Sequence, residues 1–346
     1  MHSNANQVHR DARLYFAEGD LVLRAAGSDG VHLFRVHKFL LKHHSMAFKD
    51  MFHAEDGSSS DTYDGVPVAD LPGDRAEDLA LLLTYLYNPS QLSFKRLDPN
   101  KPIELSGVIR LADKYLLEPL HDYLVQQVAS DWPTTLQEWD IREAELQAIR
   151  KVAAEDKKKY WELVPEPVAA ILFAKEFGCS QILPAAFYQL AQTNFNRDWN
   201  DETIQNDSWQ WDTLLARWTM LEKDDLVRFL HGCQSVDDYY VVADSLVSEH
   251  CYPPWEHYEE GLENLCKTSK CYAFLAELVA VVWGRGARRN PLQLLLDCLE
   301  YEKYPQLSKE RFPDGLCEHC RESLPEIIAR KRKWVWDRLP EYFRLQ

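Results

Sequence analysis

The sequence predicts an α+β fold class: a small sheet with packed helices in the first third of the chain, followed by a mainly α-helical C-terminal region. Short runs of β-branched and aromatic residues occur near the N-terminus, at 19–23 and 31–36. After His37 the apolar residues recur at helical spacing instead. Beyond Trp132 strand signals almost vanish, which predicts helices to the C-terminus.

The first elements are the two strands of a β-hairpin. The segments GDLVL and VHLFRV flank the Gly and Asp-containing turn AAGSDG. His32, Phe34 and Val36 share one face of the return strand, so that strand is at least half-buried. Two short helices are expected next, one around Leu40 and one around Phe48.

One further strand and three helices complete this part of the chain. The acidic, Ser-rich residues 55–65 predict an exposed loop, and VPVADLP predicts the strand. Asp74 and Glu77 have capping-box spacing, which predicts Asp74 as the N-cap of the first helix. The second helix is expected to begin near Pro102. The residues expected to face inward are Leu79, Leu82, Leu83, Leu86, Leu105, Val108, Ile109, Ala112, Leu120, Leu124 and Val128.

The remaining helices are expected from periodicity and from breaks rich in Pro, Gly and Asn. They are predicted at 134–162, 167–177, 182–194, 208–231, 236–249, 255–284, 291–303 and 314–338.

The composition favours proteins as partners. A net charge of −16 repels phosphate backbones and anionic headgroups, which argues against direct nucleic-acid or membrane binding. The N-terminal residues lack the apolar run of a secretory signal, so we expect an intracellular protein of the cytoplasm or nucleus. In that setting the 8 cysteines are expected to be reduced thiols.

The segments GDLVLRA, LFRVHKFLLKHHSMAFKDMF, VADLPGDRAEDLALLLTYLYNP and IRLADKYLLEPLHDYLV, in this order, resemble the BTB/POZ domain. The sequence is most similar to fungal BTB proteins with a helical C-terminal extension, which also end in a pattern like WDRLPEYFRL. The resemblance implies a flexible N-terminal tail at 1–16, a BTB/POZ-like domain at 17–130 and an all-helical region at 131–346.

The resemblance also implies where partners bind. Asp20 and Lys38 match a pair that forms a charged pocket near the dimer interface of BTB transcription regulators. Tightly swapped BTB dimers carry an extra N-terminal strand and helix, whereas mostly polar residues precede Asp20 here, so weak homo-oligomerisation is expected instead. Cullin-binding relatives carry an apolar-x-Glu element, and here His53 precedes Glu55, so a cullin scaffold stays an alternative without motif support.

The sequence contains two groups of potential metal ligands. His37, His43 and His44 have no cysteine nearby, which favours structural or solvent-exposed histidines. Cys317 and Cys320 form a C-x-x-C motif that could bind zinc with one or two of Cys251, His257, Cys266 and Cys271. Because a second C-x-x-C is missing, paired buried thiols are favoured and no cofactor is expected.

Aromatic and basic clusters are candidate contacts of the C-terminal region. In Trp209-Gln-Trp211 and Trp334-Val-Trp336 the two indoles point to different sides of a helix, so one of each pair is a candidate partner contact. The basic residues 330–333 fit either a nuclear-import signal or a solvated helix end.

The motifs of common enzyme classes are absent, including G-x-S-x-G, H-E-x-x-H and the phosphate-binding glycine loops. The sequence therefore predicts a non-enzymatic protein–protein interaction module, whose BTB domain binds another BTB domain or a scaffold while the helical region recruits a second protein. The alternatives are a substrate receptor of a cullin-type ubiquitin ligase and an orphan Cys/His hydrolase.

Overall fold

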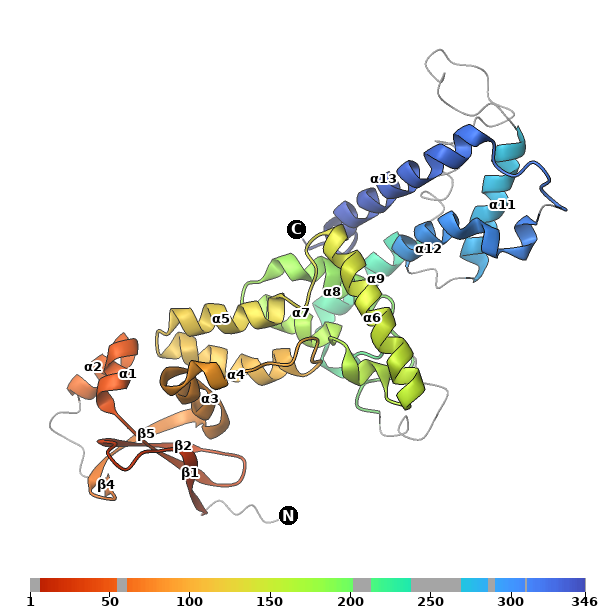
Figure 1. Ribbon diagram of the computed structural model, residues 1–346. Helices are drawn as coiled ribbons and strands as arrows, with labels where there is room; N and C mark the ends of the chain where they lie inside the picture. Colours follow the sequence, from red (N-terminus) through yellow and green to blue (C-terminus); the bar gives the residue numbers. More distant parts are fainter. Residues whose placement is uncertain are drawn as a thin grey trace. The chain divides into compact units, whose positions relative to one another are not determined.

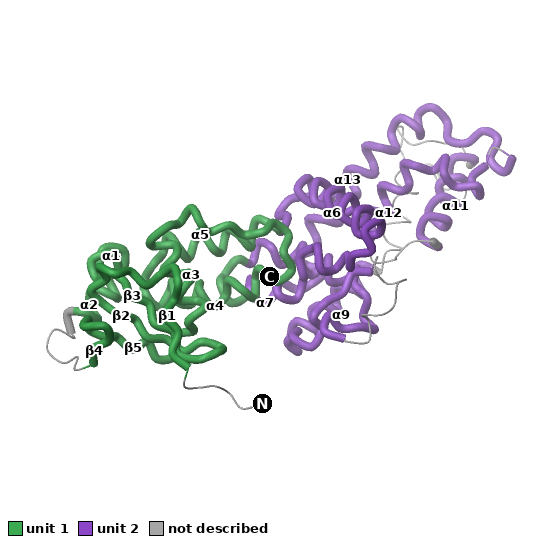
Figure 2. The backbone as a smooth tube through the Cα atoms, turned by 60° about the horizontal axis from the view of Figure 1, so that its bottom comes forward, with its two compact units in different colours: residues 1–131, 175–179 green, residues 132–174, 180–346 purple. Residues whose placement is uncertain are grey.

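The computed structural model describes residues 7–54, 61–201, 213–237, 269–285, 290–308 and 310–345. The chain divides into two compact units, one formed by residues 1–131 and 175–179 and the other by residues 132–174 and 180–346 (Figure 2). The first unit contains a small sheet with helices, and the second is mainly helical (Figure 1). The predicted fold class is confirmed.

The sheet of the first unit has the strand order β1-β3-β2-β5-β4. Its hairpin is the predicted one, because β2 and β3 pair antiparallel with Leu23 opposite Phe34. β1 pairs parallel with β3, and β5 pairs parallel with β2. The strands are β1 (Val8–Tyr15), β2 (Leu21–Ala26), β3 (Val31–Val36), β4 (Thr62–Tyr63) and β5 (Val66–Arg75).

The prediction of a flexible tail at 1–16 is wrong for residues 8–15, which form β1. Edge strands commonly carry charged side chains, and four of the eight residues of β1 are His, Arg or Asp. Three side chains anchor it: Leu14 is buried, the Tyr15 hydroxyl donates to Asp64 at 2.6 Å, and the Phe16 ring stacks on Tyr87 at 4.5 Å. The sheet therefore has an N-terminal strand that pairs within its own chain.

The helices of the first unit bury the predicted apolar stripes. All eleven residues predicted to face inward from the three longer helices are buried, several of them at 0 % exposure. Each such leucine contributes about 1.5–3 kcal/mol through burial. The helices are α1 (Lys38–His44), α2 (Met46–Ala54), α3 (Ala76–Tyr87), the short η1 (Pro89–Gln91), α4 (Lys101–Lys114) and α5 (Glu118–Ala129).

The prediction that Asp74 caps the first of these helices is wrong. α3 begins at Ala76, and Arg75 is its N-cap residue. The Asp74 side chain is buried and accepts hydrogen bonds from Lys114 and Tyr115 of the next helix and its C-cap. Glu77 accepts instead from the backbone N–H of Ser28 at 2.9 Å. β5 extends through Arg75, so Asp74 serves a tertiary contact and not the helix start.

The described part of the second unit is helical apart from short connections and one isolated parallel bridge between Asp198 and Ala216. Residues 213–217 are not helical, although helix was predicted there. Its elements are α6 (Leu136–Asp156), η2 (Tyr160–Leu163), α7 (Pro167–Glu176, whose last two residues belong to the first unit), η3 (Ser180–Ile182), α8 (Leu183–Leu190), η6 (Trp218–Met220), α9 (Lys223–Asp237), α11 (Ser269–Arg285), α12 (Pro291–Asp297), η7 (Cys298–Lys303), η8 (Pro305–Leu307) and α13 (Glu318–Tyr342).

The long helix α13 lies at the centre of the packing in this unit. It packs against α6, α8, α9 and α12. Just beyond its last turn, Phe343 stacks on Phe187 of α8 at 5.4 Å. A Cβ at Gly232 of α9 would lie 1.8 Å from the Phe343 ring, so this close approach requires glycine.

Candidate interaction sites

The predicted pair Asp20 and Lys38 meets through the backbone. The Asp20 carboxylate accepts a hydrogen bond from the backbone N–H of Lys38 at 2.7 Å, and so satisfies a donor in the first turn of α1. The Lys38 ammonium lies 5.9 Å from the centroid of the Phe52 ring. Because Asp20 is exposed, the pair does not carry the desolvation cost of a buried ion pair.

Large apolar side chains on α1, on α2 and in the α4–α5 turn are exposed. Phe39 of α1 is 76 % exposed and Met46 of α2 is 56 % exposed. The hydroxyl of Ser45 donates to the backbone carbonyl of Tyr115 at 2.6 Å, which ties the α1–α2 turn to the α4–α5 turn, where Leu116 is 61 % exposed. We call Phe39, Met46 and Leu116 the α1–α2 face. Large exposed apolar groups are common on interaction surfaces.

The three histidines of this region make aromatic contacts. The His37 Nδ1 lies 3.0 Å from the Tyr87 hydroxyl, which also accepts from the His37 backbone N–H at 2.8 Å. His43 stacks on Phe39 with ring centroids 5.9 Å apart and meets His44 edge-on. Among the described residues, the one group of three or more candidate metal ligands does not include them.

The two predicted tryptophan pairs differ in what the structure describes. Trp336 is buried, with its ring 5.7 Å from that of Trp139. Trp334 is half-buried, and the guanidinium carbon of Arg338 lies 4.4 Å from the centroid of its ring. Trp334 is thus the member of its pair that can face a partner. Trp209 and Trp211 lie outside the described residues, as do Glu55 and the side chain of His53 from the cullin comparison.

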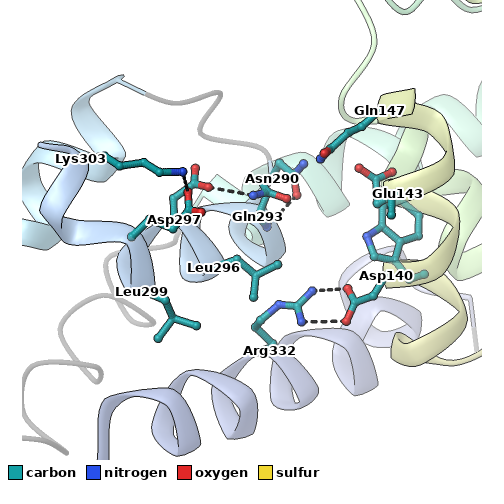
Figure 3. Close-up of a pocket in the computed structure, with 13 residues that line it drawn as sticks. Asp140, Glu143, Gln147, Asn290, Gln293, Leu296, Asp297, Leu299, Lys303 and Arg332 are labelled. Carbon is teal, nitrogen blue, oxygen red and sulfur yellow. Dashed lines mark hydrogen bonds and ion pairs between the residues drawn. The ribbon is translucent and has the colours of Figure 1, made fainter. Parts of the chain in front are cut away.

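A cleft of about 620 Å³ opens in the second unit among α6, α12, η7 and α13 (Figure 3). Trp139, Leu296 and Leu299 supply apolar lining. Four carboxylates and two cations surround them, which leaves a formal charge of −2. These charged groups are Asp140, Glu143, Asp297, Glu300, Lys303 and Arg332.

Both cations of the cleft are held by carboxylates. The Arg332 guanidinium pairs with both Asp140 carboxylate oxygens, and its Nε donates to the backbone carbonyl of Leu292 at 3.0 Å (Figure 3). Lys303 pairs with Glu300 at 2.6 Å. Arg332 is buried, so residues 330–333 are not a uniformly solvated helix face, because one of the four cations faces inward.

Glu143 is the carboxylate of the cleft with the most unusual electrostatic environment. It points into the same space as Asp140, one helical turn away on α6 (Figure 3). Burial is the main cause that raises the pKa of Glu143, and the neighbouring Asp140 charge raises it further. A cationic group in this cleft would be favoured electrostatically.

A third cysteine lies close to the predicted C-x-x-C pair. The sulfur atoms of Cys317 and Cys320 lie within 4.8 Å of each other and of Cys271 on α11. Cys271 is one of the four completing ligands that the sequence offers. The other three, Cys251, His257 and Cys266, lie outside the described residues.

The sequence interpretation missed the cleft. The spacing of Asp140, Glu143 and Gln147 places all three on one helix face, and this signal could have found them. The pairing of Asp140 with Arg332 spans 192 residues and has no local signature.

The described helices include none that is both long and apolar enough to cross a membrane. Residues 18–130 match the family model of the BTB/POZ domain, which is a protein–protein interaction module. The match confirms the predicted resemblance for this part of the chain. No curated protein matches the chain in a sequence search. The similarity to fungal proteins with a helical extension stays a prediction.

Proposed function

We propose that the chain is a non-enzymatic intracellular adaptor: its BTB/POZ domain binds another BTB domain or a scaffold, and its helical unit recruits a second protein. The match of residues 18–130 to an interaction domain is the observation that carries this proposal. The exposed α1–α2 face supports it, because Phe39 and Met46 are available for contact on that domain.

The α1–α2 face has the composition of a binding surface. Burying Phe39 and Met46 against a partner would each contribute about 1.5–3 kcal/mol. Lys42, His43 and His44 lie in the last turn of α1, the helix that also carries Phe39. These basic side chains favour an acidic partner surface, and the chain has an excess of acidic residues, with 55 Asp and Glu against 39 Lys and Arg. A second copy of the chain fits that requirement.

The cleft of the second unit is our candidate for recruitment of the second protein. Its apolar lining and its formal charge of −2 suit a peptide segment that presents a Lys or Arg side chain beside an apolar residue. A cation placed near Glu143 would offset the cost of its partial burial. Half-buried Trp334 lies on α13, which also provides Arg332 to the cleft.

The decisive experiment compares the self-association of matched variants. Light scattering of the full chain and of Phe39→Asp/Met46→Asp is measured at several concentrations, together with co-purification of differently tagged copies. The control is Ile141→Asp on α6, which changes a residue of 62 % exposure in the other unit.

Loss of self-association in the double variant, with the control unchanged, supports BTB–BTB binding. If the wild-type chain stays monomeric, the same variants are tested for binding to purified BTB domains and to a purified cullin. Cullin binding that depends on Phe39 favours the ubiquitin-ligase alternative. No binding in any of these assays would refute the proposal, and a hyperreactive cysteine labelled by a thiol probe would favour the hydrolase.

A further inference from the structure

The sulfur atoms of Cys271, Cys317 and Cys320 lie within 4.8 Å of one another. Two sulfur atoms bound to one tetrahedral zinc ion are about 3.8 Å apart, since each Zn–S bond is about 2.3 Å. The three thiols are therefore within a small side-chain adjustment of that arrangement. Cys271 and Cys320 are buried and Cys317 is partly buried, so bulk water has limited access.

Backbone N–H groups are directed at two of these sulfurs. The N–H of Cys317 donates to the Cys271 sulfur at 3.2 Å, and the N–H of Cys320 donates to the Cys317 sulfur at 3.5 Å. Cys317 is the N-cap residue of the 25-residue α13, where the helix dipole favours negative charge. Both features place partial positive charge beside the sulfur atoms, and thiolate is the form that binds a metal.

Other contacts hold the two cysteine-bearing segments together. Lys270, next to Cys271, pairs with Asp314, three residues before Cys317. One turn further along α11, the Phe274 ring meets Phe312 edge-on at 5.4 Å, and Glu277 accepts from Arg311 at 2.7 Å. The segment 311–317 is thereby fixed along α11, and the start of α13 follows directly from it (Figure 1).

Two buried cysteines elsewhere have a different environment. Burial raises the pKa of Cys179 and of Cys298, as expected for thiols that stay protonated. Neither belongs to a group of three ligands among the described residues. They are suitable controls, because they are buried cysteines without a cluster.

We propose that Cys271, Cys317 and Cys320 are three ligands of a structural zinc ion that joins the start of α11 to the start of α13. Each thiol loses its proton to solvent when its sulfur binds the metal. Zinc is the expected metal because it prefers sulfur ligands in tetrahedral structural sites. Three thiolates leave a fourth position for one further donor or for water.

The test begins with the metal content of the full chain purified in reducing buffer without chelator. Elemental analysis is expected to find about one zinc ion per chain. After zinc removal, titration with Co²⁺ alone is expected to produce the near-ultraviolet thiolate-to-cobalt charge-transfer band and the visible bands of tetrahedral cobalt.

Variants then assign the ligands. Cys320→Ser and Cys271→Ser are each expected to lose most of the zinc and to weaken the charge-transfer band. Cys317→His should retain zinc, because imidazole is also a zinc ligand. Cys179→Ser should keep the wild-type content. Chelator is expected to lower the thermal midpoint of the wild type and of Cys179→Ser.

Two results would overturn the proposal even if a variant misfolds. One is a wild-type chain that holds under about a tenth of an equivalent of zinc and shows no charge-transfer band with Co²⁺. The other is a cobalt spectrum that the combined Cys271→Ser/Cys317→Ser/Cys320→Ser variant retains in full.

Discussion

The carboxylate of Asp74 at the end of β5 accepts hydrogen bonds from the hydroxyl of Tyr115 and the ammonium of Lys114, at the end of α4. Asp74 and Tyr115 are both 4 % exposed, so a buried polar contact joins the sheet to the helices of the first unit. The Tyr115 ring also stacks on Phe48 of α2 at 4.1 Å. Burial is the main cause that raises the pKa of Tyr115, and its bond to Asp74 adds to the shift.

Asp74→Ala should therefore destabilise the first unit. Removing the carboxylate leaves a buried hydroxyl without its acceptor, and we expect the free energy of unfolding to fall by about 3 kcal/mol. Urea unfolding of the full chain, followed by circular dichroism, measures the change. The matched control is Asp70→Ala, which breaks the exposed pair with Arg24 and should cost under about 1 kcal/mol. Equal losses of stability in the two variants would show that the buried contacts of Asp74 are not the main cause of its effect.

Tyr15 should make the stability of the first unit sensitive to alkaline pH. Burial and a hydrogen bond to Asp64 raise the pKa of Tyr15 to about 12. Because the pKa of Tyr15 is higher in the folded state, its protonated hydroxyl stabilises the fold. This stabilisation is complete below the unfolded pKa of about 10 and is lost as pH rises from about 10 to about 12. Urea unfolding of wild type and Tyr15→Phe across this range should show their difference shrinking. In an Asp64→Ala background the same substitution should have a smaller effect, and an unchanged effect would rule out the proposed hydrogen bond as the cause.

The pair of Arg332 and Asp140 should stabilise the second unit. Arg332→Met leaves Asp140 and the Leu292 carbonyl without their donor, and we expect a loss of about 2 kcal/mol because Asp140 is still 42 % exposed. Arg332→Lys should recover part of the loss, since an ammonium cannot form both parallel bonds. The control is Arg330→Met on the exposed side of α13. Thermal unfolding measures all three, and a larger effect of the control would argue against the buried role of Arg332.

Glu143→Gln should stabilise the second unit at neutral pH. Because burial raises the pKa of Glu143, the ionised carboxylate is a cost to the folded state above that pKa. The gain should be largest at about pH 8 and should vanish at about pH 3, where the carboxyl is protonated in both states. Urea midpoints at the two pH values test this. Equal gains at both would show that charge is not the cause.

The same substitution also tests the recruitment proposal. A lysine-containing peptide that binds the cleft should bind more weakly to Glu143→Gln than to wild type. Glu145→Gln is a control on the same helix, since Glu145 does not line the cleft. Binding is measured by calorimetry, and equal affinities for wild type and Glu143→Gln would remove Glu143 from the site.

Local chemistry was sufficient to predict much of the first unit. The hairpin of β2 and β3 follows from two alternating runs around a short turn, and the stripes of α3, α4 and α5 follow from helical periodicity. In each case the burial of a residue is decided by its neighbours within a few positions, so the periodicity of the sequence is enough to predict it.

The tertiary structure decided the contacts whose partners are distant in the chain. β1 becomes recognisable through its pairing with β3, because half of its residues are His, Arg or Asp and its apolar pattern is weak. Asp74 has the spacing of a helix cap, yet a tyrosine 41 positions away accounts for its burial. Cys271 comes within reach of Cys317 across 46 residues, and Arg332 reaches Asp140 across 192. Such contacts depend on how elements pack, and packing brings together side chains that share no local pattern.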